Sequence, residues 1–243
     1  KNDRIQLNDD SLWPHDQEWE HPPGGAVELK SIRDNLLQGD TKLADSLMVH
    51  YFSNKSITRS HQTLGDLYLN WEHREISDYK RSLDLSTAIS QTNYKVEGYK
   101  VEQKVFVSHP HQSIVIILTS NHPNGLNGNI RLDRPLDEGE KTVKIKSFDQ
   151  QIIMQGEVTQ RGGKFKSKSH PILSGVKFET RLLAKNSGGK ITSINNSLMI
   201  AGVKNLTLII TSNSDYYTPQ YVDKNDREQK KVMVSNMNEI EYL

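Results

Sequence analysis

Residues 94–101 read Tyr-Lys-Val-Glu-Gly-Tyr-Lys-Val, in which apolar and lysine side chains alternate on both sides of a central Glu-Gly pair. A period of two places successive side chains on opposite faces of a β-strand. Glycine adopts positive φ at little cost, so Glu97-Gly98 can form the two-residue turn of a hairpin. The segment therefore predicts two antiparallel strands joined by a tight turn.

The same alternation continues on both sides of this hairpin. One strand face carries Tyr99, Val101, Val105 and Val107, and a later one carries Leu206, Leu208 and Ile210. The run 114–118 is apolar at every position, which predicts a central strand covered on both faces. Further turns are predicted at Asn124-Gly125, Asn127-Gly128, Gly162-Gly163 and Gly188-Gly189. Together these patterns predict a mainly β protein, built as one large antiparallel β-sandwich of the super-sandwich type.

Residues 27–52 follow a period near four instead, which indicates helix. The apolar positions are Leu29, Ile32 and Leu36, followed by Leu43, Leu47 and Tyr51. Gly39 can end a first helix in the left-handed conformation, and Asp40 or Thr41 can cap a second. A small helical hairpin inserted into the sandwich is therefore predicted. It follows a polar loop over 13–25, where prolines and glycines disfavour regular structure.

The composition limits the possible partners. The 243 residues include 31 lysines and arginines against 30 acidic residues, which gives a formal charge of +1. Without a strong positive field, neither nucleic acid nor an anionic membrane is predicted as a partner, and a neutral sugar suits the surface better. The chain has no cysteine, which excludes disulfides and thiolate metal sites. The longest apolar run, 114–118, is far shorter than the ~20 residues of a membrane helix.

Five segments in a fixed order give a more specific indication of family. They read RIQLNDDSLW (4–13), SHQTLGDLYL (60–69), DYKRSLDLSTA (78–88), VFVSHPHQ (105–112) and, with a weaker match, VKFETRL (176–182). Together these segments resemble the N-terminal β-sandwich domain of glycoside hydrolase family 95, the α-L-fucosidase family. Members of that family usually begin with further strands ahead of the first segment, which suggests a truncated start.

The resemblance implies that the parent protein is an inverting exo-α-L-fucosidase acting on terminal L-fucose, or the similar L-galactose, in glycans. In that family the catalytic groups lie in an (α/α)6 barrel that follows this domain. Residues 1–222 would then form a non-catalytic N-terminal domain, and residues 223–243 would begin the linker to the barrel. The chain alone is expected to be inactive and to use no cofactor. Its expected partners are the barrel and a fucosylated oligosaccharide, in a periplasmic or extracellular location.

The resemblance also implies that a loop of this domain reaches the barrel's pocket. The residues predicted at the substrate rim are Asn8, Asp10, Ser11, Trp13, His61 and Gln62. Trp19 is a candidate for stacking on a sugar, because an aromatic face can bury the C–H face of a sugar ring. Trp71 ends a predicted strand and is expected in the core or an interface. No catalytic residue is predicted within the chain.

Other interpretations of the same residues stay open. Asn8 and Asp10 could satisfy backbone amides in a turn, while Leu12 and Trp13 anchor the loop. For the whole chain, the alternatives are a stand-alone carbohydrate-binding module and a structural interaction domain.

Two further groups of residues could in principle carry chemistry. The carboxylates nearest the loop are Asp9, Asp10, Glu18 and Glu20, and the sequence does not assemble a catalytic pair from them. His109 and His111 flank Pro110 with no third ligand nearby, so no metal site is predicted.

Overall fold

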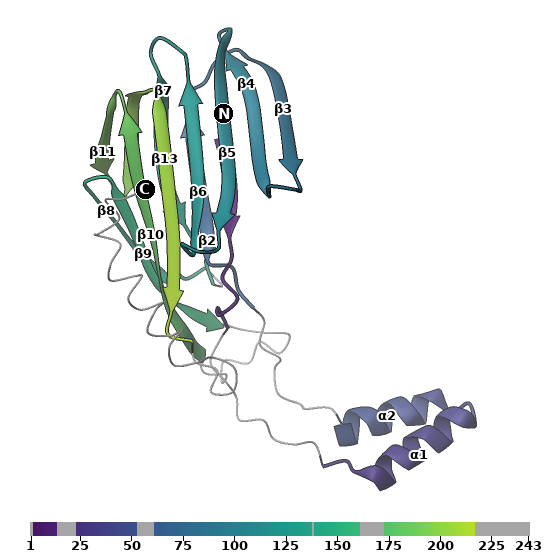
Figure 1. Ribbon diagram of the computed structural model, residues 1–243. Coiled ribbons are helices and arrows are strands. Elements are labelled where there is room, and N and C mark those ends of the chain that lie inside the picture. The colour runs from purple at the N-terminus through teal and green to yellow at the C-terminus, as the bar shows by residue number, and fades with distance from the viewer. Residues whose placement is uncertain (1, 14–22, 53–60, 138, 161–172, 217–243) are drawn as a thin grey trace.

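The computed structural model describes residues 2–13, 23–52, 61–137, 139–160 and 173–216. Within them, two antiparallel sheets face each other as a β-sandwich (Figure 1). The smaller sheet has the order β1 (Asn2–Leu7), β2 (Gly65–Trp71), β7 (Leu126–Asp133), β12 (Ser197–Val203) and β11 (Lys190–Ile194). This architecture confirms the predicted mainly β sandwich.

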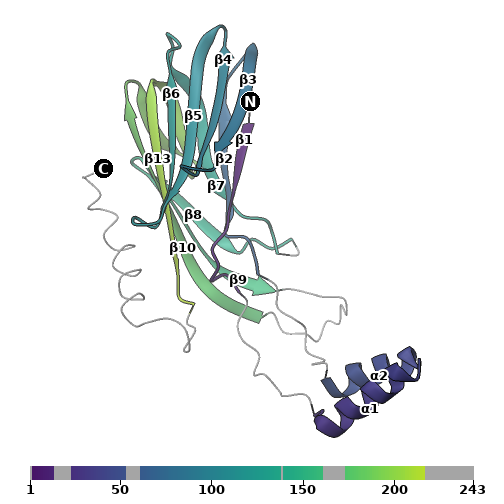
Figure 2. The same cartoon turned by 45° about the vertical axis from the view of Figure 1, so that its right-hand side comes forward.

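The larger sheet has eight strands, and β6 and β13 lie at its centre. Its order is β3 (Ile76–Asp84), β4 (Ile89–Val96), β5 (Tyr99–Ser108), β6 (Ser113–Ser120), β13 (Asn205–Ser214), β10 (Leu173–Ser187), β9 (Gln151–Gln160) and β8 (Val143–Phe148). The two views show the smaller sheet lying against one face of the larger sheet (Figures 1 and 2). One end of the sandwich, where β1 and β13 end and β2 begins, therefore gathers segments far apart in the sequence.

The hairpin predicted from residues 94–101 is confirmed. Val96 pairs with Tyr99 at the end of the β4–β5 ladder. Glu97 and Gly98 both have positive φ, of 50° and 84°. Two left-handed residues in succession match the strand twist of a tight hairpin, as the Glu-Gly pair predicts.

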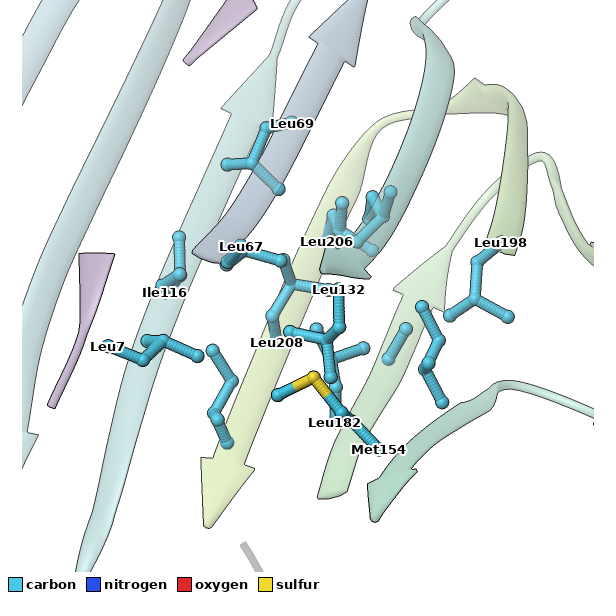
Figure 3. Close-up of a cluster of buried hydrophobic side chains, with 14 of the residues drawn as sticks. Leu7, Leu67, Leu69, Ile116, Leu132, Met154, Leu182, Leu198, Leu206 and Leu208 are labelled. Atoms are coloured by element: carbon cyan, nitrogen blue, oxygen red, sulfur yellow. The ribbon is translucent and has the colours of Figure 1, made fainter. Parts of the chain in front are cut away.

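The core lies between the two sheets and consists of aliphatic side chains (Figure 3). The smaller sheet contributes Leu67, Leu69, Ile130, Leu132 and Leu198, and the larger sheet contributes Ile116, Leu118, Met154, Leu182, Leu206 and Leu208. Each of these is at most 2% exposed. Burial of this apolar surface is the main force that holds the sheets together.

The central strand β6 corrects one expectation. Ile116 and Leu118 point into the core, whereas Val115 and Ile117 on the other face are only half-buried. Neighbours in the same sheet give that outer face partial cover, because Phe106 and Ile209 pair with Val115. Within the described residues, no second layer of strands or helices covers it.

The predicted turn at Asn127-Gly128 is wrong, because both residues lie inside β7. A Cβ atom on Gly128 would lie 2.2 Å from the Asn70 carbonyl oxygen and 3.0 Å from the Trp71 Cα. Glycine is therefore required here by the close approach of β2. The predicted turns at Asn124-Gly125 and Gly188-Gly189 are confirmed, and Gly162-Gly163 lies outside the described residues.

The inserted helical hairpin is confirmed as α1 (Ala26–Leu37) and α2 (Thr41–Phe52). Gly39 has a φ of 82°, and the Asp40 carboxylate accepts a 3.0 Å hydrogen bond from the Leu43 amide. The helices pack on each other and lie apart from both sheets in the two views (Figures 1 and 2).

The predicted apolar face of this hairpin is buried only in part. Ile32 and Ala44 are buried, whereas Leu29, Leu36 and Leu43 remain exposed, because among the described residues the two helices pack mainly on each other. Neither described helix is long and apolar enough to cross a membrane. The boundary predicted at residue 222 lies outside the described residues.

Candidate functional site

The loop after β1 folds into a tight turn over Asp9 to Leu12. The Leu12 amide donates to the Asp9 carbonyl at 3.3 Å. The Asp9 carboxylate accepts from both the backbone amide and the hydroxyl of Ser11, at 3.1 and 2.6 Å. Aspartate commonly caps its own turn in this way, so the local sequence Asp-Asp-Ser favours this conformation. The turn leaves Asn8 and Asp10 exposed.

Two serines of β13 fix this turn to the larger sheet. Ser212 donates to the second Asp9 carboxylate oxygen at 2.7 Å. The hydroxyls of Ser11 and Ser214 lie 2.5 Å apart. Because Ser11 donates its proton to Asp9, Ser214 is the donor in this second contact. Leu12 is fully buried beside them and anchors the turn in the core.

The segment before β2 runs beside the loop and completes its support. The backbone amide of Gln62 donates to the Leu12 carbonyl at 3.0 Å, and the backbone amide of Leu64 donates to the Leu7 carbonyl at the same distance. The His61 ring nitrogen Nε2 lies 2.6 Å from the Asp9 carbonyl oxygen. These bonds bring together the first two segments of the predicted family signature.

Trp13 and His61 form an exposed aromatic pair on this support. Their ring centroids lie 5.4 Å apart in an edge-to-face arrangement. The Trp13 indole donates to the Asp10 carbonyl at 2.8 Å, while its backbone carbonyl accepts from the Val176 amide at 3.3 Å. The Trp13 residue remains 38% exposed. A fixed, solvent-facing aromatic ring with polar neighbours is the kind of surface on which a sugar ring can stack.

Arg134 is a buried residue that donates several hydrogen bonds, two of them to the segment before β2. Its guanidinium donates to the Gln62 side chain at 2.8 Å, to the Thr63 carbonyl at 3.1 Å and to the Thr142 hydroxyl at 2.5 Å. The residue is only 6% exposed, and burial lowers the pKa of this guanidinium while the charge of Asp137 opposes that shift. Several bonds to a buried charge hold the segment before β2 in place.

Gln62 extends this network to β9. Its side-chain amide donates to the Thr159 carbonyl at 2.6 Å, and the Thr159 hydroxyl donates to the Asp137 carboxylate. The Gln62 side chain therefore connects the segment before β2 to β9 and to Arg134.

A groove of about 700 Å³ lies next to the loop, across the ends of β8, β9, β10 and β13. Its lining includes Thr159 and Ser214, which are part of the loop's support. The charged lining residues are Lys141, Lys144, Lys177, Glu157, Glu179 and Asp215. Because three positive and three negative groups line the groove, it has no strong electrostatic field of either sign. The Glu179 carboxylate accepts from Arg181 and Gln155, both at 2.5 Å.

The predicted rim residues divide into two groups. Asn8, Asp10, Trp13 and His61 face solvent around the loop, whereas Ser11 and Gln62 are part-buried and make hydrogen bonds within the fold. The six lie together at one end of the sandwich, and their contact with substrate stays a prediction. Trp19, Glu18 and Glu20 lie outside the described residues.

Neither Asp9 nor Asp10 is placed as one of a pair of catalytic carboxyl groups. Inverting hydrolysis needs two carboxyl groups about 6.5–9.5 Å apart, one of which stays protonated. The Asp9 carboxylate is engaged by Ser11 and Ser212, and Asp10 is exposed at the turn. Among the described residues, no group of three or more His, Cys, Asp and Glu side chains could hold a metal ion.

Ser212, Ser214 and Arg134 were not predicted as part of the site, although the alternation of their strands carries a signal. Ser212 and Ser214 continue the core-facing positions of β13, after Leu208 and Ile210. Arg134 likewise follows the core-facing Leu132 of β7 by two residues. A polar side chain at an inward-facing position needs a buried partner. Each of these residues finds that partner in the loop or the segment before β2.

Comparison with known proteins identifies the family. Residues 1–219 match the family described as "Glycosyl hydrolase family 65, N-terminal domain". The chain belongs to this family. The match confirms that this is the N-terminal domain of a glycoside hydrolase.

Curated relatives of this domain include two fucosidases. Over 159 residues it is 26% identical to "Alpha-L-fucosidase 2" of Arabidopsis thaliana, covering 63% of this chain and 18% of that protein. Over 126 residues it is 30% identical to "Probable alpha-fucosidase A" of Aspergillus niger, covering 48% of this chain and 15% of that protein. The chain thus spans less than a fifth of the length of these relatives.

Among solved structures, the domain is similar to a "Putative kojibiose phosphorylase from human microbiome". The TM-score is 0.42 at 13% sequence identity, and the match covers 75% of this chain and 26% of that one.

Proposed function

We propose that this chain is the non-catalytic N-terminal domain of an inverting, exo-acting α-L-fucosidase of the family 95 type. In the parent enzyme it packs on an (α/α)6 barrel and contributes the loop around Trp13 to the substrate pocket. Two fucosidases among the curated relatives and the five signature segments support this choice of activity.

The observation that carries the proposal is the supported loop with its exposed aromatic pair. Asp9 and Ser11 fix the loop to β13, and Leu12 anchors it in the core. Trp13 and His61 then face outward on a base that is already ordered. A binding surface held in advance loses little conformational freedom when substrate arrives, which is what a rim residue outside the reacting centre requires.

The hydrogen bonding of Asp9 supports a non-catalytic role for this loop carboxylate. A general acid needs a raised pKa, which arises from an apolar pocket or a second nearby carboxylate. The Asp9 carboxylate instead accepts hydrogen bonds from two hydroxyl groups and an amide, which hold the loop in place. The cleavage of the glycosidic bond is therefore assigned to the barrel, and a periplasmic or extracellular location belongs to the same proposal.

The rim role is tested by kinetics of the full-length parent enzyme carrying Trp13→Ala. We expect KM for a fucosylated oligosaccharide to rise roughly tenfold, with kcat changed much less, because the contact lies outside the bond that breaks. Tyr99→Ala, an exposed aromatic residue in the β4–β5 hairpin, is the matched control. Equal KM values for the parent enzyme and Trp13→Ala would refute the contribution to the pocket.

The non-catalytic role is tested on the 243-residue chain with 4-nitrophenyl α-L-fucopyranoside. No release of nitrophenol above the buffer rate is expected. Release that survives purification to homogeneity would show that the chemistry lies in this domain.

The exposed Trp13 also supports the alternative of a stand-alone carbohydrate-binding module. Titration of the chain with a fucosylated trisaccharide separates the two. Millimolar binding that is lost in Trp13→Ala favours the module, whereas no binding at this loop without the barrel favours the docked domain.

A further inference from the structure

A second pocket lies at the opposite end of the sandwich from the Trp13 loop. It has a volume of about 150 Å³ and is lined by Asp3, Trp71, His73, Ile76, Tyr79, Thr92, Tyr94 and Gln103. The β1–β2 ladder fixes the separation, because Leu7 pairs with Gly65 at the loop end and Asn2 with Asn70 at this end. Five steps of about 3.3 Å place the two ends more than roughly 16 Å apart. Figure 2 shows β1 beginning near β3 and running down towards the loop.

Aromatic rings form one wall of this pocket. The Trp71 and His73 rings stack with centroids 5.8 Å apart and planes 13° from parallel. The Tyr94 hydroxyl lies 3.1 Å from the His73 ring nitrogen Nδ1. Trp71 and Tyr94 are at most 9% exposed, so packing in the core fixes these two rings of the wall. Rigid aromatic walls suit the C–H face of a ligand.

A β-bulge places a third ring at the pocket's edge. Ser77 pairs with Lys95 and Lys80 with Asn93, so two residues of β3, Asp78 and Tyr79, lie opposite the single residue Tyr94. Asp78 has a φ of 52° and forms a 2.8 Å ion pair with Lys95. Bulges redirect side chains, and a left-handed aspartate is uncommon in a strand.

The bulge brings Tyr79 to the rim of the pocket. Its ring centroid lies 6.2 Å from that of Tyr94, yet the residue is 63% exposed. Tyr79 is thus an aromatic surface open to solvent at the edge of a fixed aromatic wall.

Two polar side chains, Asp3 and Gln103, also line this pocket. The Gln103 side-chain amide donates to the Asp3 carboxylate at 2.9 Å, and Gln103 is only 6% exposed. An ionised carboxylate can accept several hydrogen bonds, so Asp3 keeps acceptor capacity for a ligand hydroxyl. Among the described lining residues there is no lysine or arginine. Burial lowers the pKa of His73 to about 4, which leaves its ring neutral near pH 7.

We propose that this pocket binds one neutral pyranose unit of a glycan. The C–H face of the sugar lies against the Tyr79, Tyr94 and Trp71 wall, and its hydroxyls donate to Asp3 and accept from Gln103. The volume is well below the ~300–1,000 Å³ of sites for larger ligands, which favours a single ring over a chain of sugars. The negative Asp3 and the lack of a lysine or arginine in the described lining disfavour an anionic sugar.

The test is a titration of the 243-residue chain followed by NMR. The probes are methyl α-L-fucopyranoside, methyl β-D-glucopyranoside and, as the anionic counterpart, methyl β-D-glucuronide. We expect at least one neutral glycoside to shift the Trp71 indole and His73 ring signals with a Kd on the order of 1 mM. The uronide should bind at least several-fold more weakly.

Matched variants locate the binding. Tyr79→Ala removes an exposed ring and should weaken binding roughly tenfold, whereas Tyr99→Ala should leave it unchanged. Trp13→Ala should also leave it unchanged, so this site and the proposed loop function succeed or fail separately. No shift at Trp71 and His73 with either neutral probe overturns the proposal, as does equal binding by the uronide or an unchanged Kd in Tyr79→Ala.

Discussion

The Asp9 carboxylate accepts a 2.7 Å hydrogen bond from the hydroxyl of Ser212, which lies 203 residues later in the chain. This bond joins the loop after the first strand to the last described strand. The other carboxylate oxygen of Asp9 accepts hydrogen bonds from Ser11 and so stabilises the turn. One side chain therefore both shapes the loop and fixes it to the larger sheet, and the exposed pair Trp13 and His61 depends on both effects.

Asp9→Ala is predicted to loosen the loop and destabilise the domain. It removes the acceptor of three hydrogen bonds, and bonds to a charged group contribute about 1.5–3 kcal/mol each when measured singly. Because the site is only part-buried, we expect a total loss of about 2–3 kcal/mol in the free energy of unfolding. Urea denaturation followed by circular dichroism measures it.

Asp10→Ala is the matched control for this change, because Asp10 is the exposed neighbour in the same turn. Its effect should stay within about 0.5 kcal/mol, as for most surface substitutions. Equal losses for Asp9→Ala and Asp10→Ala would show that the carboxylate of Asp9 is not the anchor.

Arg134→Met is predicted to destabilise the domain by about 3 kcal/mol, because it leaves buried acceptors without their charged donor. Methionine fills a similar volume, so the loss of hydrogen bonds to Gln62, Thr63 and Thr142 dominates the effect. Arg131→Met is the control, since Arg131 is more exposed and pairs with Asp133 at the surface. Its cost should be about 1 kcal/mol or less.

The local pattern was sufficient to predict the hairpin at residues 94–101, because alternation and a Glu-Gly turn act within a few residues. The core positions of β13 followed from the same period. Which elements pair across the sheet is a long-range property, so no local pattern indicates that Ser212 meets Asp9. The turn predicted from Asn127-Gly128 was wrong, because glycine occurs both in turns and where two strands approach closely.

Gly128→Ala is predicted to cost more than about 3 kcal/mol or to prevent folding, because its Cβ would meet the backbone of β2 and cannot be accommodated by a side-chain movement. Gly98→Ala is the control. Gly98 has open space around it and a φ of 84°, so alanine there pays only for the left-handed conformation, about 1–2 kcal/mol. The soluble yield and the thermal melting temperature of the two variants measure this difference in stability. A Gly128→Ala protein as stable as Gly98→Ala would contradict the requirement for close approach.

His73 is predicted to make the stability of the domain depend on pH. Burial in the sandwich lowers its pKa from 6.5 to about 4 in the folded protein, with a smaller contribution from His122. Above pH 6.5 the ring is neutral in both the folded and the unfolded state, and its contribution to stability is fully present. Between pH 6.5 and 4 the unfolded chain binds the proton first, so the folded state loses stability as the pH falls. Below pH 4 the contribution levels off, because both states are then protonated.

His73→Phe should remove this component while keeping a ring against Trp71. Urea midpoints at pH 7, 5.5 and 4.5 measure the change, with His111→Phe as the control because His111 is exposed. As the pH falls across this window, the parent chain should lose more stability than His73→Phe does. His111→Phe should lose as much stability as the parent chain. A parallel course for all three proteins would mean that the His73 ring titrates at its ordinary pKa in the folded state.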